Sequence, residues 1–164
     1  MPSRAALSRP QAVAAVRGWI GTPYSLRARV RGAGADCCTL LVEYLIEISA
    51  ATAEDFKELP AYSGDWFLHA SSERYLRSLM RFGTKIATTI CRGGVKAEPG
   101  DIALFRVVGS RLYNHGAVVT SWPWGVHAQA EGVREVNLVS CPLTSFRKME
   151  LFNPFEDPDG KFHL

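Results

Sequence analysis

The hydrophobic pattern of the N-terminal part of the chain predicts two helices. In residues 10–20, apolar side chains recur at the three- and four-residue spacing of a helix, and Pro10 suits its first turn. A second helix is predicted from about Cys37 to Ser49, with Asp36 as its N-cap. Polar side chains occupy only a narrow stripe of this second helix, at Thr39, Glu43 and Glu47. Because its apolar arc is wide, this helix is expected to lie at the centre of the core.

The segments that flank the second helix have little periodicity. Residues 24–35 contain two glycines and are predicted to form a loop. Residues 50–70 mix aromatic side chains with proline and glycine and are assigned to no element. A helical pattern returns from Ser71 to Phe82, with Ser71 or Ser72 as the cap.

The pattern becomes that of β-strands after the turns at residues 93–94 and 98–101. The predicted strands, joined by short turns that contain glycine or proline, are Asp101–Val108, His115–Ser121, Gly125–Ala130 and Val133–Val139. Helices followed by a run of antiparallel strands indicate an α+β fold. With no internal repeat or long linker, residues 1–164 are predicted to form one domain, with a core of about residues 10–150 and an extended C-terminal tail.

Composition agrees with a globular protein of this size. The chain has 164 residues, of which 47% are hydrophobic and 21% charged, so it can bury a sizeable core without metal or disulfides. No segment approaches the roughly 18 apolar residues of a membrane span. Arg4, Arg9 and Arg17 interrupt every candidate signal-peptide core near the N-terminus. Synthesis in the cytoplasm without a signal peptide, and no membrane insertion, are therefore expected.

Positive charge is concentrated near the N-terminus, although the net charge is only +3. Six arginines precede the first acidic residue, Asp36. Such a block is commonly a solvated basic face. Alternatively Arg27, Arg29 and Arg31, which lie just before the cysteines, favour an acidic substrate. A nucleic-acid partner is not expected, because the chain carries no nucleic-acid-binding motif or aromatic platform.

The cysteines are too few and too unevenly spaced for a disulfide framework, and none form a C-x-x-C pair. Reduced thiols are expected, with neither metal nor cofactor, although zinc binding by a set of cysteines and histidines is an alternative. Cys37 and Cys38 stand at the predicted helix start, where unpaired backbone N–H groups stabilise a thiolate. Both fall within the apolar arc, so periodicity cannot choose between them.

Two of the histidines strengthen the case for a cysteine nucleophile. His115 and His127 lie in consecutive predicted strands, as antiparallel neighbours could. Either one alone is commonly structural. Together with a cysteine at a helix start, they suggest a general base and the partner that orients it. His69 and His163 lie in poorly patterned regions and are predicted to be structural or exposed.

Several motifs together resemble those of the NlpC-type cysteine peptidases of bacterial cell walls. The segment "GWIGTPYSLRARVRGAGADCCTLLVEYL" is similar to the first half of that family, with Gly-Thr-Pro-Tyr, a glycine-bearing loop and Asp-Cys opening a helix. The segments "EPGDIALFRV", "NHGAVVT" and "GVHAQAEGVREV" resemble its Pro-Gly-Asp strand, its catalytic-histidine strand and the strand of the third polar residue. The matches occur in family order over roughly residues 10–140.

The resemblance implies a minimal papain-like fold, in which the nucleophile helix packs on a C-terminal antiparallel sheet. It implies that Cys37 is the nucleophile, His115 the general base and acid, and His127 the orienting residue. Tyr24 would border the site and help to bind the oxyanion. The substrate would be the stem peptide of peptidoglycan, cleaved at the D-γ-glutamyl-diaminopimelate amide. We place Asp36 and the three arginines named above with Tyr24 in the candidate oxyanion- and substrate-binding set.

Two positions depart from the family pattern, which usually has Ser-Gly or a similar small pair after the nucleophile. Here Cys38 and Thr39 occupy those positions. A thiol can replace a serine sterically, while Thr39 is expected to tighten the packing of the helix.

The segment "AYSGDWFLHASSERYLRSLMRF" resembles the branch of the family found in prophages and gene transfer agents. That resemblance implies a tail component, in contact with other tail proteins, which opens the cell wall locally during entry from the periplasmic side. Two alternatives remain at this point. One is a catalytically silent tail-assembly protein, and the other is a Cys-His acyltransferase on the same fold.

Overall fold

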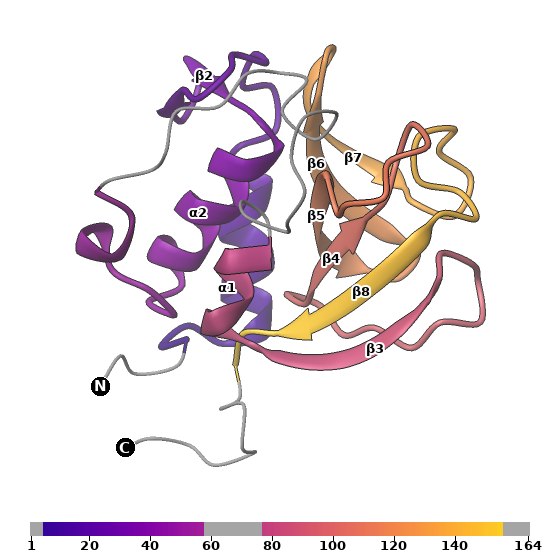
Figure 1. The fold of residues 1–164 in the computed structure, drawn as a ribbon. Helices are drawn as coiled ribbons and strands as arrows, with labels where there is room; N and C mark the ends of the chain where they lie inside the picture. Colours follow the sequence, from indigo (N-terminus) through magenta and orange to yellow (C-terminus); the bar gives the residue numbers. More distant parts are fainter. Residues whose placement is uncertain (1–4, 58–76, 156–164) are drawn as a thin grey trace.

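Two helices pack against one face of an antiparallel sheet in a computed structural model, which describes residues 5–57 and 77–155 (Figure 1). The helices are α1 (Arg9–Arg17) and α2 (Cys37–Glu47). Between them lie the short paired strands β1 (Arg29–Val30) and β2 (Gly34–Ala35). The 3₁₀ turns η1 (Ala53–Phe56) and η2 (Arg77–Phe82) follow α2.

The described residues form a six-stranded sheet in the order β3-β8-β4-β5-β6-β7, with every neighbouring pair antiparallel. Its strands are β3 (Thr84–Ile90), β4 (Ile102–Phe105), β5 (His115–Ser121), β6 (Trp124–Gln129), β7 (Gly132–Asn137) and β8 (Lys148–Asn153). The predicted α+β class is therefore confirmed, with the helices first and the sheet after them.

The sequence pattern found the central elements and missed the strands at one side of the sheet. The four predicted strands correspond to β4, β5, β6 and β7, although β4 ends at Phe105, before the predicted Val108. Strand β3 was missed because its side chains are largely exposed and a bulge interrupts its register between Lys85 and Ala87. Strand β8 was missed because a charged residue, Glu150, is buried in its apolar run.

The prediction of a helix from Ser71 to Phe82 can be compared with the structure only at its end. The described part, Arg77–Phe82, is a 3₁₀ turn rather than an α-helix. The remainder, together with most of the unassigned segment 50–70, lies outside the described residues.

Helix α2 lies close against the middle of the sheet because Gly116 of β5 has no side chain. A Cβ atom added at Gly116 would lie 2.5 Å from Leu41 Cδ1 and 3.3 Å from Leu104 Cδ2. The main core between the layers includes the fully buried Leu40, Leu41, Tyr44 and Val118. The prediction that α2 is central is therefore confirmed. A second apolar cluster, which includes Phe105, covers other residues of the sheet.

Helix α1 is tied to the start of β4 through an arginine. The Arg9 guanidinium donates to Pro99 O at 2.8 Å, to Asp101 Oδ1 at 3.0 Å and to Asn153 Oδ1 at 3.1 Å. The Tyr44 hydroxyl donates to Gly100 O at 2.6 Å, which adds a contact from α2 to the same turn. The Pro-Gly-Asp turn thus joins both helices to the sheet. Among the helices of residues 5–57 and 77–155, none is long and apolar enough to cross a membrane.

Candidate active site

The N-terminus of α2 is fixed by a buried aspartate. Asp36 Oδ1 accepts hydrogen bonds from the backbone N–H groups of Cys38 at 2.9 Å and Thr39 at 2.8 Å. Asp36 Oδ2 accepts from the N–H of Arg27 at 2.7 Å. In return, the Asp36 N–H donates to Thr39 Oγ1 at 2.9 Å, which completes a capping box. The predicted N-cap is confirmed, and Thr39, fully buried, takes part in the cap.

The structure separates the two adjacent cysteines. Cys38 is buried and belongs to the main core. Cys37 is partly exposed, and its thiol donates to Asn114 O at 3.7 Å. The backbone N–H of Gly116 also acts on the Cys37 sulfur. Since both sequence neighbours of His115 contact the thiol through their backbones, Cys37 lies beside the backbone from which the His115 imidazole projects.

The two predicted catalytic histidines are hydrogen-bonded to each other. His115 begins β5 and His127 lies within β6, and the distance from His115 Nε2 to His127 Nδ1 is 2.8 Å. Both imidazoles are buried, and their rings meet edge to face at 4.9 Å between centroids. The register of the strands explains the pairing, because Ala117 of β5 stands opposite His127. The expected juxtaposition of these strands is therefore present.

This contact defines which ring nitrogen is available to the thiol. If His115 Nδ1 is to accept a proton from Cys37, its Nε2 must carry a hydrogen and donate to His127 Nδ1. His127 then carries its own hydrogen on Nε2. His127 can therefore orient the first imidazole and still accept its hydrogen bond after that imidazole becomes charged.

Burial keeps both members of the cysteine–histidine pair neutral at rest. Burial, and then the charge of Asp36, raises the pKa of the Cys37 thiol to about 12, while backbone N–H groups act in the opposite direction. Burial, and then the neighbouring imidazole, lowers the pKa of His115 to about 3. Burial lowers the pKa of His127 to about 4, opposed by the charge of Glu131. A neutral thiol beside a neutral base suits proton transfer that accompanies nucleophilic attack.

The buried histidines should make the fold sensitive to acid. The pKa values of His115 and His127 in the folded protein are about 3 and 4, below the ordinary value of 6.5. At a pH between these values and 6.5, the unfolded chain therefore binds more protons than the folded protein does. The stability they contribute is complete above pH 6.5 and falls as pH drops toward 4. At pH 4.5 the loss should be about 2.5 kcal/mol for each imidazole. Urea unfolding at pH 7.5 and pH 4.5 measures it.

The variant His127→Gln is the comparison for this measurement. It keeps a polar side chain in β6 and removes one of the two imidazoles whose pKa is lowered by folding. Its stability should therefore decline less between the two pH values than that of the wild type. An equal decline in both proteins would contradict the assignment of this acid sensitivity to the histidine pair.

Tyr24 lies at the same end of α2 as Cys37. The residue forms a bridge with Ala35, and 40% of its surface is exposed. Burial, and then the nearby Cys37 and Asp36 side chains, raises the pKa of the Tyr24 hydroxyl. The structure thus brings together Tyr24, Asp36 and Cys37, while the part of Tyr24 in oxyanion binding stays a prediction.

The Gly-Thr-Pro-Tyr turn is held by the hairpin that joins β6 and β7. Thr22 O accepts from the N–H of Val133 at 2.9 Å, and Thr22 Oγ1 accepts from the N–H of Gly32 at 2.9 Å. Gly132 has a φ of +101°, and a Cβ there would lie 2.9 Å from Thr22 O. The hairpin that follows His127 therefore also supports the turn that carries Tyr24.

The arginines of the basic segment do not all lie at this site. Arg29 Nε donates to Glu43 at 2.7 Å, and Arg31 donates to Glu47 at 2.5 Å. These glutamates lie roughly 9 and 15 Å beyond Cys37 along the helix axis. Arg29 and Arg31 thus pair with the polar stripe of α2, and the expectation that the three arginines act together on substrate stays a prediction.

Arg27 is the member of the basic segment closest in structure to the helix start. Its backbone N–H contacts Asp36, its φ is +64°, and the residue is exposed. Asp36 itself is 2% exposed, and backbone N–H groups contact both of its carboxylate oxygens. This geometry assigns Asp36 to positioning rather than to contact with substrate, whereas a substrate contact by Arg27 stays a prediction.

Sequence reasoning missed two residues that define the position of the thiol. Asn114 fixes the start of β5, because its side chain accepts from Val107 N at 2.8 Å and donates to Val107 O at 3.2 Å. Gly116 admits α2, as described above. Both flank His115 in "NHGAVVT", but the sequence could not show that their backbones meet Cys37. Within the described ranges, no group of three or more His, Cys, Asp or Glu side chains is arranged to hold a metal ion.

Comparison with known proteins identifies the fold. The sequence matches no protein-family model and no curated protein. Among solved structures, the NlpC/p60 domain of the peptidoglycan hydrolase SagA superposes with a TM-score of 0.56 at 17% identity, over 88% of this chain and 98% of that one. NlpC1 from Trichomonas vaginalis superposes with a TM-score of 0.52 at 15% identity, over 88% of this chain and 45% of that one. The predicted papain-like architecture, of the NlpC type, is confirmed.

Proposed function

We propose that this protein is a cysteine peptidase that hydrolyses an amide bond in the stem peptides of peptidoglycan. The observation that carries the proposal is the position of the Cys37 thiol at the start of α2, against the backbone on both sides of His115, which is itself bonded to His127. This arrangement supplies a nucleophile, a base and an orienting residue.

The chemistry begins with attack of the Cys37 sulfur on the substrate carbonyl carbon. The thiol proton moves to His115 Nδ1 as the carbon–sulfur bond forms, because burial makes a free thiolate costly. The backbone N–H of Cys37, which Asp36 does not accept, and the Tyr24 hydroxyl stabilise the oxyanion. The protonated His115 gives its proton to the leaving amine as the carbon–nitrogen bond breaks. Water, deprotonated by His115, then releases the acid product and regenerates the thiol.

The substrate class is supported by two observations of different kinds. The motifs of the chain resemble those of the NlpC-type peptidases, and one protein with a similar fold is named as a peptidoglycan hydrolase. Within that class, the D-γ-glutamyl-diaminopimelate amide is the bond we propose. Stem peptides carry free carboxylates, for which the exposed Arg27 beside the helix start is a suitable partner.

The finer biological role is a tail component of a phage-like particle that opens the cell wall locally, on the periplasmic side, together with other tail proteins. Its support is the resemblance of the segment from residue 61 to 82, most of which lies outside the described residues. The proposed hydrolysis does not depend on this role.

Digestion of purified peptidoglycan, with mass analysis of the fragments, tests the proposal. The wild type should release fragments with a new amine and a new carboxylate at one stem-peptide amide, and Cys37→Ala should release none. Adding a high concentration of an amine acceptor separates the alternatives, because an acyltransferase would yield the amide adduct in preference to the acid. A folded wild type that cleaves no stem peptide from several wall types would contradict the proposal.

A further inference from the structure

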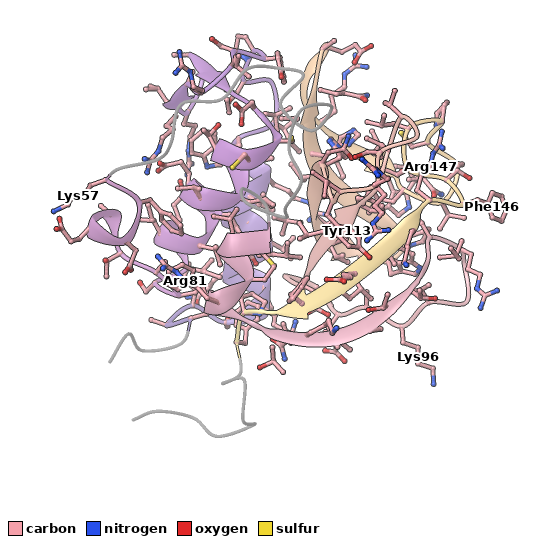
Figure 2. All side chains as sticks on the ribbon, in the orientation of Figure 1. Lys57, Arg81, Lys96, Tyr113, Phe146 and Arg147 are labelled. Atoms are coloured by element: carbon pink, nitrogen blue, oxygen red, sulfur yellow. The ribbon has the colours of Figure 1, made fainter. Side chains whose placement is uncertain are left out.

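The connection between β7 and β8 encloses Cys91, which follows β3. The Cys91 N–H donates to Arg147 O at 2.9 Å, and Cys91 O accepts from Phe146 N at 3.0 Å. Its thiol, fully buried, donates to Leu138 O at 3.4 Å. Figure 2 shows Phe146 and Arg147 on this connection, on the side of the sheet away from the helices. The backbone of Cys91 is therefore bonded to the end of the connection next to β8, and its sulfur contacts the end next to β7.

The same connection carries the remaining thiol, Cys141. Its N–H donates to Asn137 O at 2.8 Å, and its carbonyl oxygen accepts from Thr144 N at 3.1 Å and Ser145 N at 2.8 Å. These bonds fold residues 137–145 into consecutive tight turns. Thr144 Oγ1 donates to Leu138 O at 2.7 Å, the oxygen that the Cys91 thiol also contacts. Cys141 thus belongs to the small loop into which the Cys91 sulfur projects.

Exposure and electrostatics distinguish the two thiols. Cys141 is partly exposed, whereas Cys91 has no exposed surface. Burial, and then the nearby Cys141 thiol, raises the pKa of Cys91 to about 12. The backbone bonds of Cys141 and the contact of the Cys91 thiol with Leu138 O place both thiols at one small loop. Both thiols are free in the structure.

We propose that Cys91 and Cys141 are a site of disulfide formation, which joins the end of β3 to the β7–β8 connection when the protein meets a disulfide oxidant. This inference goes beyond the proposed peptidase function and does not depend on it.

The order of the two steps follows from exposure. The Cys141 thiolate attacks a small disulfide such as oxidised glutathione, forming a mixed disulfide and releasing one glutathione thiolate. The Cys91 sulfur then attacks the Cys141 sulfur, the bond from Cys141 to glutathione breaks, and the Cys91 proton passes to the departing glutathione thiolate. The two protein sulfurs are oxidised, and one glutathione disulfide is reduced to two thiols. Cys91 cannot react first, because it is buried and its thiolate is disfavoured.

The crosslink would act on the second apolar cluster rather than on the candidate active site. Cys91 packs in that cluster with Phe105, Leu138 and Met149, and the connection covers it. Closing a loop of about 50 residues restricts the unfolded chain, so the melting temperature should rise by at least about 5 °C. The Cys37 site should keep its activity, since neither cysteine of the pair contacts it.

The test uses full-length protein in a Cys37→Ser background, which removes the partly exposed thiol of the candidate site. The protein is incubated with oxidised or reduced glutathione and digested without reduction, and the peptides are mapped by mass. The expected result is a peptide that joins Cys91 to Cys141, with a higher melting temperature in the oxidised sample. In the additional variant Cys141→Ser, the crosslinked peptide and the rise in melting temperature should both be absent.

Two results would overturn the proposal. One is a stable glutathione adduct on Cys141 with Cys91 still reduced, which would mean that the sulfurs cannot meet. The other is recovery of both thiols unmodified from folded protein after prolonged oxidation. A separate hydrolysis assay with the Cys37-containing Cys141→Ser variant tests the peptidase function independently of either result.

Discussion

Cys37→Ala is expected to lower kcat/KM on stem-peptide substrates by about 10⁴-fold or more, because removal of the nucleophile leaves only substrate binding and oxyanion stabilisation. The matched variant Cys38→Ala removes the adjacent thiol from the core. Since Cys38 is 5% exposed and packs in the main core, its loss should cost about 1 kcal/mol of stability and change kcat/KM by less than about 10-fold. Initial rates from amine release measure both values.

Folding must be controlled in this comparison, because both cysteines belong to the first turn of α2. Thermal unfolding should show Cys37→Ala to be close to the wild type, since Cys37 is not one of the residues of the main apolar core. Full activity in a folded Cys37→Ala protein would exclude it as the nucleophile. Loss of activity only in Cys38→Ala would assign the chemistry to the adjacent residue.

Asp36→Ala should cause the largest loss of stability among substitutions at the site. It removes the acceptor of three backbone N–H groups in a residue that is 2% exposed. Loss of the cap and of a buried acceptor should cost about 2–4 kcal/mol, which lowers the melting temperature by about 5–15 °C. Hydrolysis should also fall, because the start of α2 fixes the position of the Cys37 sulfur and of its backbone N–H.

Asp36→Asn separates the role of the cap from the role of the charge. The amide keeps an oxygen for Cys38 and Thr39, but it presents an NH₂ group to the N–H of Arg27, so the loss of stability should be smaller than with alanine. Removing the negative charge should lower the pKa of Cys37, which Asp36 raises in the wild type. Alkylation of Cys37 by iodoacetamide at pH 8 should therefore become faster. An unchanged alkylation rate, with the fold retained, would show that the charge does not act on the thiol.

The sequence predicted the parts of the site that depend on local structure. Asp36 before an apolar helix is a local capping signal, and the strands of His115 and His127 have clear alternation and short turns. Choosing Cys37 over Cys38 required the family resemblance, because helical periodicity placed both in the apolar arc. The structure distinguishes them by contacts with Asn114 and Gly116, which are remote in sequence from the helix.

The features that the sequence did not reveal depend on contacts between segments distant in the chain. Arg29 and Arg31 stand beside the cysteines in sequence, but the chain turns between β1 and β2 and brings them to the acidic stripe of α2. Likewise, β3 and β8 have weak patterns of their own and are stabilised by pairing with each other as neighbours at one side of the sheet. Such partners are set by tertiary contacts rather than by local propensity.

Because β8 is the last described strand but lies inside the sheet, the sheet can be completed only late in synthesis of the chain. This last described strand inserts between β3 and β4, so neither of those strands has its full set of neighbours until Lys148–Asn153 has been synthesised. Before then β4 is an open edge beside β5, the strand that carries His115. Pairings between such distant segments form slowly. A growing chain therefore lacks a rigid support for its histidines, and any hydrolytic activity should be delayed until translation of the sheet is finished.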